Sequence, residues 1–119
     1  MRWFGHFLIC VACVMMVPLA QAKSELKVGS AQEQARVHTD LASRYYQVGQ
    51  VSIAVDEAKS ALSSVADYVP AHTVLALIYA QLHQNDLADT HFAAALNAAA
   101  AQKISQTDVR NSYAWYLCS

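Results

Sequence analysis

Residues 41–62, LASRYYQVGQVSIAVDEAKSAL, come back 34 positions later as residues 75–96, LALIYAQLHQNDLADTHFAAAL. In both stretches leucine, alanine and aromatic residues recur three or four positions apart, which is the spacing of one apolar helix face. A polar break divides each stretch into two helical halves. The sequence therefore predicts two helical hairpins in tandem that use the same packing residues. These are Leu41, Ala42, Tyr45, Ala54 and Ala61, with the counterparts Leu75, Ala76, Tyr79, Ala88 and Ala95.

A 34-residue period that carries Leu-Ala-x-x-Tyr, then Ala, then Ala-Leu is typical of tetratricopeptide (TPR) repeats. In such repeats small alanines let paired helices approach closely, and the tyrosine fills the wedge between neighbouring units. We therefore predict an all-α fold, a TPR helix-hairpin solenoid of about two and a half repeats. The first repeat covers residues 35–68, the second 69–102, and residues 103–119 supply the first helix of an incomplete third repeat.

Local signals predict where these helices begin and end. Ser30 and Glu33 have the spacing of a capping box, which starts a helix. Gly49 ends the first helix of the first hairpin. In the second hairpin no glycine stands at this point, and Asn85-Asp86 is predicted to cap the second helix instead.

The N-terminal stretch resembles an export signal. One positive charge, a long apolar run and small residues at Ala20 and Ala22 predict a signal peptide over residues 1–22, cleaved after Ala22. An uncleaved membrane anchor is the alternative, because about 17 apolar residues reach the lower limit for spanning a bilayer. Cys13 is a weak candidate for lipidation, since the residues before it match a lipoprotein signal poorly. A polar leader, residues 23–34, then leads into the first helix.

The composition excludes several classes of function. Eight basic residues face nine acidic ones, so we expect no nucleic-acid partner. The chain has no nucleophile elbow, phosphate loop or other catalytic motif, and we expect neither enzymatic activity nor a cofactor. His38 and His72 have no second ligand at i+4, and packing or surface roles are favoured over metal binding for His38, His72, His83 and His91. Cys118 is expected to be a packed small apolar residue.

A binding groove is predicted on the first helices of the repeats, because these helices line the concave face of such solenoids. The residues expected there are mostly uncharged, and amides, hydroxyls and apolar groups suit an extended or helical polypeptide better than an acidic tail. They are Arg36, Thr39, Ser43, Tyr46, Gln47, Thr73, Leu77 and Gln81.

The last residues are expected to form an exposed apolar surface. Tyr113, Trp115, Tyr116 and Leu117 lie on a helix whose second, covering helix is absent from the sequence. A solenoid end normally needs a polar cap, so this surface predicts self-association, binding of a partner or low stability. The chain is accordingly expected to be the front portion of a longer solenoid.

Several segments of this chain resemble one known protein family. The segments are Ser30–Ala35, residues 41–50, Asp67–His72 and above all VRNSYAWYLC at 109–118. Together they resemble the type IV pilus biogenesis and stability protein family (PilW/PilF type) over about residues 31–118. The resemblance implies a periplasmic scaffold, usually attached to the outer membrane, that helps the outer-membrane secretin assemble.

The expected function is thus a non-catalytic protein-interaction scaffold in type IV pilus biogenesis. The resemblance implies that the chain is exported to the periplasm and has the secretin or another pilus-assembly component as its partner. Association with the outer or inner membrane would occur through the N-terminus. Two alternatives stay open: a generic periplasmic TPR adaptor for another envelope complex, and the N-terminal TPR portion of a larger envelope enzyme.

Overall fold

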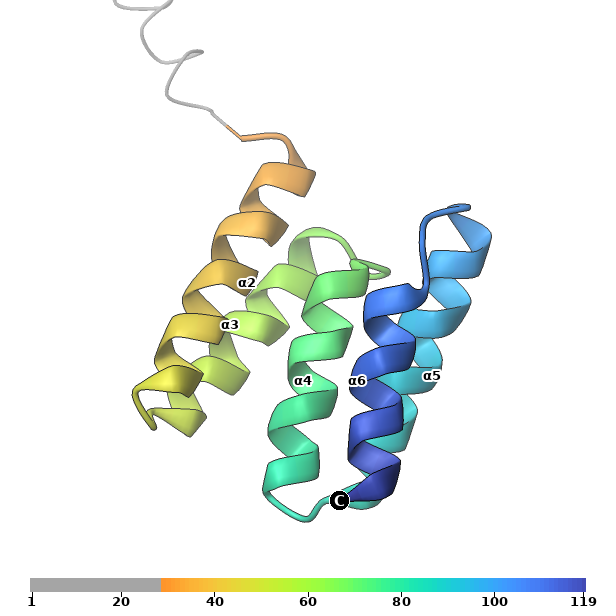
Figure 1. Ribbon diagram of the computed structural model, residues 1–119. Helices are drawn as coiled ribbons and strands as arrows, with labels where there is room; N and C mark the ends of the chain where they lie inside the picture. Colours follow the sequence, from red (N-terminus) through yellow and green to blue (C-terminus); the bar gives the residue numbers. More distant parts are fainter. Residues whose placement is uncertain (1–28) are drawn as a thin grey trace, which may run out of the picture.

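The computed structural model describes residues 29–119, and these residues form five α-helices without a strand (Figure 1). This confirms the all-α class. The predicted signal peptide, its alternative as an anchor, Cys13 and the first half of the polar leader, residues 23–28, lie outside the described residues. The helices are α2 (Ala31–Gln47), α3 (Val51–Ser64), α4 (Val69–Gln81), α5 (Asn85–Ala101) and α6 (Thr107–Cys118).

The start of α2 follows the predicted signal. The Ser30 hydroxyl accepts a hydrogen bond from the backbone N–H of Glu33 at 3.3 Å, which satisfies one of the free amides of the first turn. Pro70 lies in the first turn of α4, where its missing N–H costs no helical hydrogen bond.

Three helices end in the same way, with one residue in the left-handed conformation. Gly49 has φ +81°, His83 has φ +58° and Lys103 has φ +56°. At each end two backbone N–H groups turn back to helix carbonyls; Gly49 N and Gln50 N, for example, bond the carbonyls of Tyr46 and Tyr45. This pair of backbone hydrogen bonds is a Schellman motif.

The second hairpin corrects one prediction. Asn85 is already the first residue of α5 and Asp86 lies in its first turn, while Gln84 precedes the helix without a side-chain capping bond. The reason is that His83 occupies the position of Gly49, 34 residues on, and makes the same left-handed turn. α5 therefore begins at the same repeat position as α3, which likewise has no side-chain capping bond.

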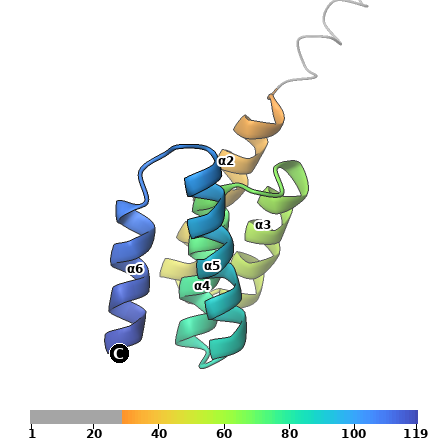
Figure 2. The same ribbon diagram turned by 90° about the vertical axis from the view of Figure 1, so that its right-hand side faces the viewer.

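The helices pack as successive hairpins. α2 lies along α3 and α4 lies along α5, in each case after a short turn that makes the pair antiparallel (Figure 1). α4 also packs on both α2 and α3, which joins the two hairpins. α6 then packs on α4 and α5, as seen from the side in Figure 2.

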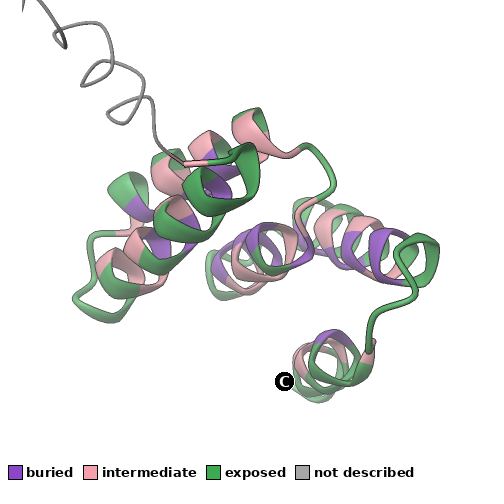
Figure 3. Ribbon diagram, turned by 90° about the horizontal axis from the view of Figure 1, so that it is seen from above, coloured by how far each residue is buried: buried purple, intermediate pink, exposed green. Residues whose placement is uncertain are grey.

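Buried residues lie on the sides of the helices that face one another (Figure 3), and α4 is covered most, with only Pro70 and Gln81 exposed. One buried cluster, around Ala35, Ala61 and Ala71, lies where α4 begins beside the first hairpin. A second joins the hairpins through Ala58, Leu75 and Tyr79, among others, and a third gathers around Phe92 between α4, α5 and α6. Of the ten predicted repeat-packing residues, eight are buried, and Leu41 and Tyr45 are half-buried.

Candidate protein-binding surface

The predicted groove residues lie on α2 and α4, the first helices of the two hairpins. Their exposure varies. Arg36, Gln47 and Gln81 are exposed, whereas Ser43, Tyr46, Thr73 and Leu77 are half-buried.

Thr39 is a correction to the predicted groove. It is only 5% exposed, and its hydroxyl donates to the carbonyl oxygen of Ala35 at 2.7 Å. The methyl group of a threonine and its internally bonded hydroxyl allow it to sit in a helix interface beside alanines. Thr39 therefore packs and does not face a ligand.

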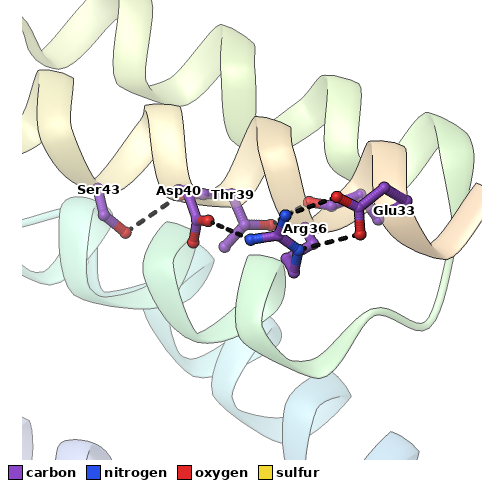
Figure 4. Close-up of polar contacts among 6 residues, drawn as sticks. Glu33, Arg36, Thr39, Asp40 and Ser43 are labelled. Atoms are coloured by element: carbon purple, nitrogen blue, oxygen red, sulfur yellow. Dashed lines mark hydrogen bonds and ion pairs between the residues drawn. The ribbon is translucent and has the colours of Figure 1, made fainter. Parts of the chain in front are cut away.

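Arg36 is engaged by two carboxylates of its own helix (Figure 4). Its Nε donates to Glu33 Oε2 at 3.1 Å, and Nη1 donates to Asp40 Oδ2 at 3.0 Å. The hydrogen bond from Arg36 lowers the pKa of Glu33, and the same bond raises the pKa of Arg36. Two carboxylates surround one guanidinium, so the three groups have a formal net charge that is negative. The predicted arginine is thus not free to attract an anionic ligand.

The hydroxyl groups of the predicted groove are also occupied. Ser43 Oγ donates to the carbonyl of Thr39 at 3.1 Å, and Thr73 Oγ1 donates to that of Val69 at 3.0 Å. The Tyr46 hydroxyl donates to Oε1 of Gln81, which links α2 to α4 across the two hairpins. These contacts join the helices that form the predicted groove. They leave few hydrogen-bond donors on this part of the groove for a partner.

A hollow of about 490 Å³ lies at the end of α4, where the α4–α5 turn meets α6. It combines the exposed side chains of Trp115 and Leu117 with the polar groups of Gln81, His83 and Asn85. Two predicted sets, the groove and the exposed end surface, meet here. The lining residues are Ala80, Gln81, His83, Asn85, Trp115, Tyr116, Leu117 and Ser119.

Sequence reasoning did not assign His83, Asn85 or Ser119 of this hollow to a binding surface. The 34-residue register carried the necessary signal, because it places His83 at the turn position of Gly49. A turn residue at the end of α4 points toward the end of α6 once α6 packs in register beside α4.

The end surface divides into a packed half and an exposed half. Tyr113 and Tyr116 pack against Phe92 with ring centroids 5.0 and 5.6 Å apart, the first tilted and the second stacked, and both are half-buried, contrary to their predicted exposure. Burial raises the pKa of Tyr116, and the nearby Asp89 carboxylate adds to this. Trp115 and Leu117 remain 61% and 64% exposed.

Cys118 is a further correction, because the structure leaves it exposed. It follows Leu117 on the side of α6 that no described helix covers. The packing on α4 and α5 uses Val109, Tyr113 and Tyr116, which recur at three- and four-residue steps, and Cys118 falls outside this series.

The histidines on the first helices each contact a side chain of the following helix. His38 Nδ1 lies 2.7 Å from Glu57 Oε2, and His72 Nδ1 lies 3.0 Å from His91 Nδ1. Within residues 29–119 no three His, Cys, Asp or Glu side chains come together in a way that could hold a metal ion. Over the same residues no helix is both long enough and apolar enough to cross a membrane.

Comparison of the chain with protein-family models, with curated proteins and with solved structures finds no match.

Proposed function

We propose that this protein is a non-catalytic TPR-type scaffold that binds a polypeptide on the face formed by α4 and α6. The observation that carries the proposal is the hollow beside the α4–α5 turn, where Trp115 and Leu117 are exposed next to amide and imidazole groups. A large exposed tryptophan beside a concave, mixed surface is the kind of site at which a partner's apolar side chain gains most from burial.

The chemistry of the hollow favours a polypeptide ligand. Trp115 and Leu117 offer apolar contact, while Gln81 and Asn85 can both donate to and accept from a peptide backbone. A nucleic acid would need clustered cations, but the Arg36 group is net negative and the whole chain carries net charge −1. An apolar anchor residue within an extended or helical segment fits best.

We further propose that the partner belongs to type IV pilus biogenesis, with the outer-membrane secretin or another pilus-assembly component as the bound protein. Support comes from the string at residues 109–118, which resembles that family and which forms most of α6. In this proposal the chain works in the periplasm, and the surface that α6 contributes binds the partner.

The test is complementation of a strain that lacks the native gene. We expect wild-type protein to restore surface pili and assembled secretin, and the double variant Trp115→Ala, Leu117→Ala to restore neither, because the anchor contacts are lost. Folding should be kept, since both side chains are largely exposed and the packing of α6 rests on Tyr113 and Tyr116.

The matched control is Ile53→Ala. Ile53 is an exposed apolar residue of α3, 42% accessible and outside the hollow, so this variant should complement fully. Full restoration of pili by the double variant at wild-type protein levels would reject the hollow as the binding site. Failure of the wild type to restore pili would reject the pilus assignment.

A further inference from the structure

The two hairpins carry different side-chain pairs at one repeat position. In the first hairpin His38 Nδ1 lies 2.7 Å from the Glu57 carboxylate, and in the second His72 Nδ1 lies 3.0 Å from His91 Nδ1. Both pairs join residues 19 apart, and the second pair is the first displaced by 34. The fold thus holds a histidine–carboxylate contact and a histidine–histidine contact in matching geometry.

Hydrogen bonding fixes the proton positions of the neutral His72–His91 pair. His72 Nε2 lies 2.9 Å from the backbone carbonyl of Ala66. Because a carbonyl only accepts, this nitrogen carries a hydrogen, and Nδ1 of the neutral ring is then an acceptor. His91 Nδ1 must therefore be the donor across the 3.0 Å contact.

Protonation of both rings is incompatible with this contact. Each imidazolium carries N–H groups on both nitrogens, so two N–H groups and two like charges would face each other at 3.0 Å. A single added proton can be accommodated, because His91 can gain it on Nε2 and still donate from Nδ1. The neutral pair can therefore take up one added proton but not two.

The surroundings of His91 also disfavour a charge. Its ring stacks on Tyr79 of α4 with centroids 5.6 Å apart, and Lys59 of α3 adds positive charge nearby. The aromatic rings of α6, Tyr113 and Tyr116, pack on Phe92 and bring no negative charge to His91. Burial first, and then His72 and Lys59, lower the pKa of His91 from its usual 6.5.

We propose that His72 and His91 form a pH-sensitive latch that holds α4 against α5 near neutral pH and weakens on acidification. Through Ala66 the latch also ties α5 to the connection between the two hairpins. In the first hairpin a charged His38 would instead attract the Glu57 carboxylate 2.7 Å away, so the like-charge conflict is confined to the second hairpin.

The sign follows from linkage. A histidine whose pKa is lower in the folded protein binds protons more readily when unfolded, so its contribution to stability is complete above pH 6.5 and is lost as the pH falls toward the folded pKa. The loss of stability should thus begin just below pH 6.5. A half-buried pair of this kind should change the folding equilibrium constant by roughly three- to tenfold.

The test compares the full chain with His91→Glu, which rebuilds in the second hairpin the pair found in the first. Urea unfolding is followed by circular dichroism at pH 7.5 and 5.5, with EDTA present so that no metal can bridge the imidazoles. We expect the wild-type midpoint to fall at pH 5.5 and that of His91→Glu to stay level or rise. His38→Gln, which leaves the latch intact, should retain the wild-type fall.

A second measurement keeps the proposal testable if His91→Glu does not fold. Titration of the imidazole C–H resonances of the wild type should show His91 gaining its proton below pH 6.5. Equal pH dependence of unfolding in wild type and His91→Glu, or a His91 titration at or above 6.5, would overturn the latch.

Discussion

The two hairpins have the same topology but differ in the size of the side chains that they bury. Every buried side chain of α2 and α3 is small, whereas α4 and α5 enclose the three largest fully buried side chains of the described residues, Phe92, Leu75 and Ile78. Polar contacts also join the helices of the first hairpin, His38 to Glu57 and Gln34 to Ser64, while the Ser30 cap and the Arg36 ion pairs lie within α2 itself. The small buried set of the first hairpin is Ala35, Thr39, Ala42, Ala54, Ala58 and Ala61.

One repeat position shows what decides the difference. Ala58 and Phe92 are 34 residues apart and both are completely buried. Ala58 belongs to the cluster in which Leu75 and Tyr79 of the next hairpin pack, so those larger side chains fill the space. Phe92 instead meets two tyrosine rings of α6. The size at a repeat position is thus set by the neighbouring unit and not by the repeat itself.

The largest expected effect is that of Phe92→Ala. Removing this ring leaves a cavity between α4, α5 and α6, and we expect a loss of about 3–5 kcal/mol in the free energy of unfolding. Urea denaturation measures it. Leu87→Ala, on the exposed side of α5, is the control and should cost less than about 1 kcal/mol. Similar losses in both variants would contradict the view that the second hairpin carries the main core.

Much of this fold could be predicted from the 34-residue period alone. The period places the hairpins, the alanine seam and the end of α2 at Gly49, because each depends on local spacing and backbone preference. It did not predict the burial of Thr39, since a threonine on a first helix reads as polar until the neighbouring alanines are in place.

The candidate site was harder to predict, because it depends on contacts between units. The division of the end surface into packed Tyr113 and Tyr116 and exposed Trp115 follows from contact with Phe92, which lies on the neighbouring helix α5 more than 20 residues earlier in the sequence. The left-handed turn at His83 was missed because histidine adopts that conformation much less readily than glycine.

The turns that close the two hairpins offer a second comparison. Gly49 and His83 make equivalent left-handed turns, and only Gly49 avoids the steric cost of a Cβ. A Cβ at Gly49 would meet no atom within 4 Å, so Gly49→Ala should lose about 1 kcal/mol through backbone strain alone. His83→Gly should gain about 0.5–1 kcal/mol.

Thermal unfolding of the two turn variants provides the measurement, with the midpoint expected to fall for Gly49→Ala and rise for His83→Gly. Asn85→Ala is the control for the second turn: Asn85 makes no capping bond, so its replacement should change stability little. A fall in the midpoint of His83→Gly would show that the imidazole contributes more to the turn than its strain costs.

The smallest expected effect is confined to the start of the first hairpin. Ser30→Ala removes the one side-chain bond to the first turn of α2, whose length of 3.3 Å places the loss at the lower end of the usual range, about 0.5 kcal/mol. Because α2 is held by small side chains, the loss should appear first as fraying. Hydrogen exchange should therefore quicken at the amides of residues 32–34 and stay unchanged in α4 and α5. Faster exchange throughout both hairpins would instead mean that the first hairpin unfolds only together with the second, and that their different contents do not give them separate stabilities.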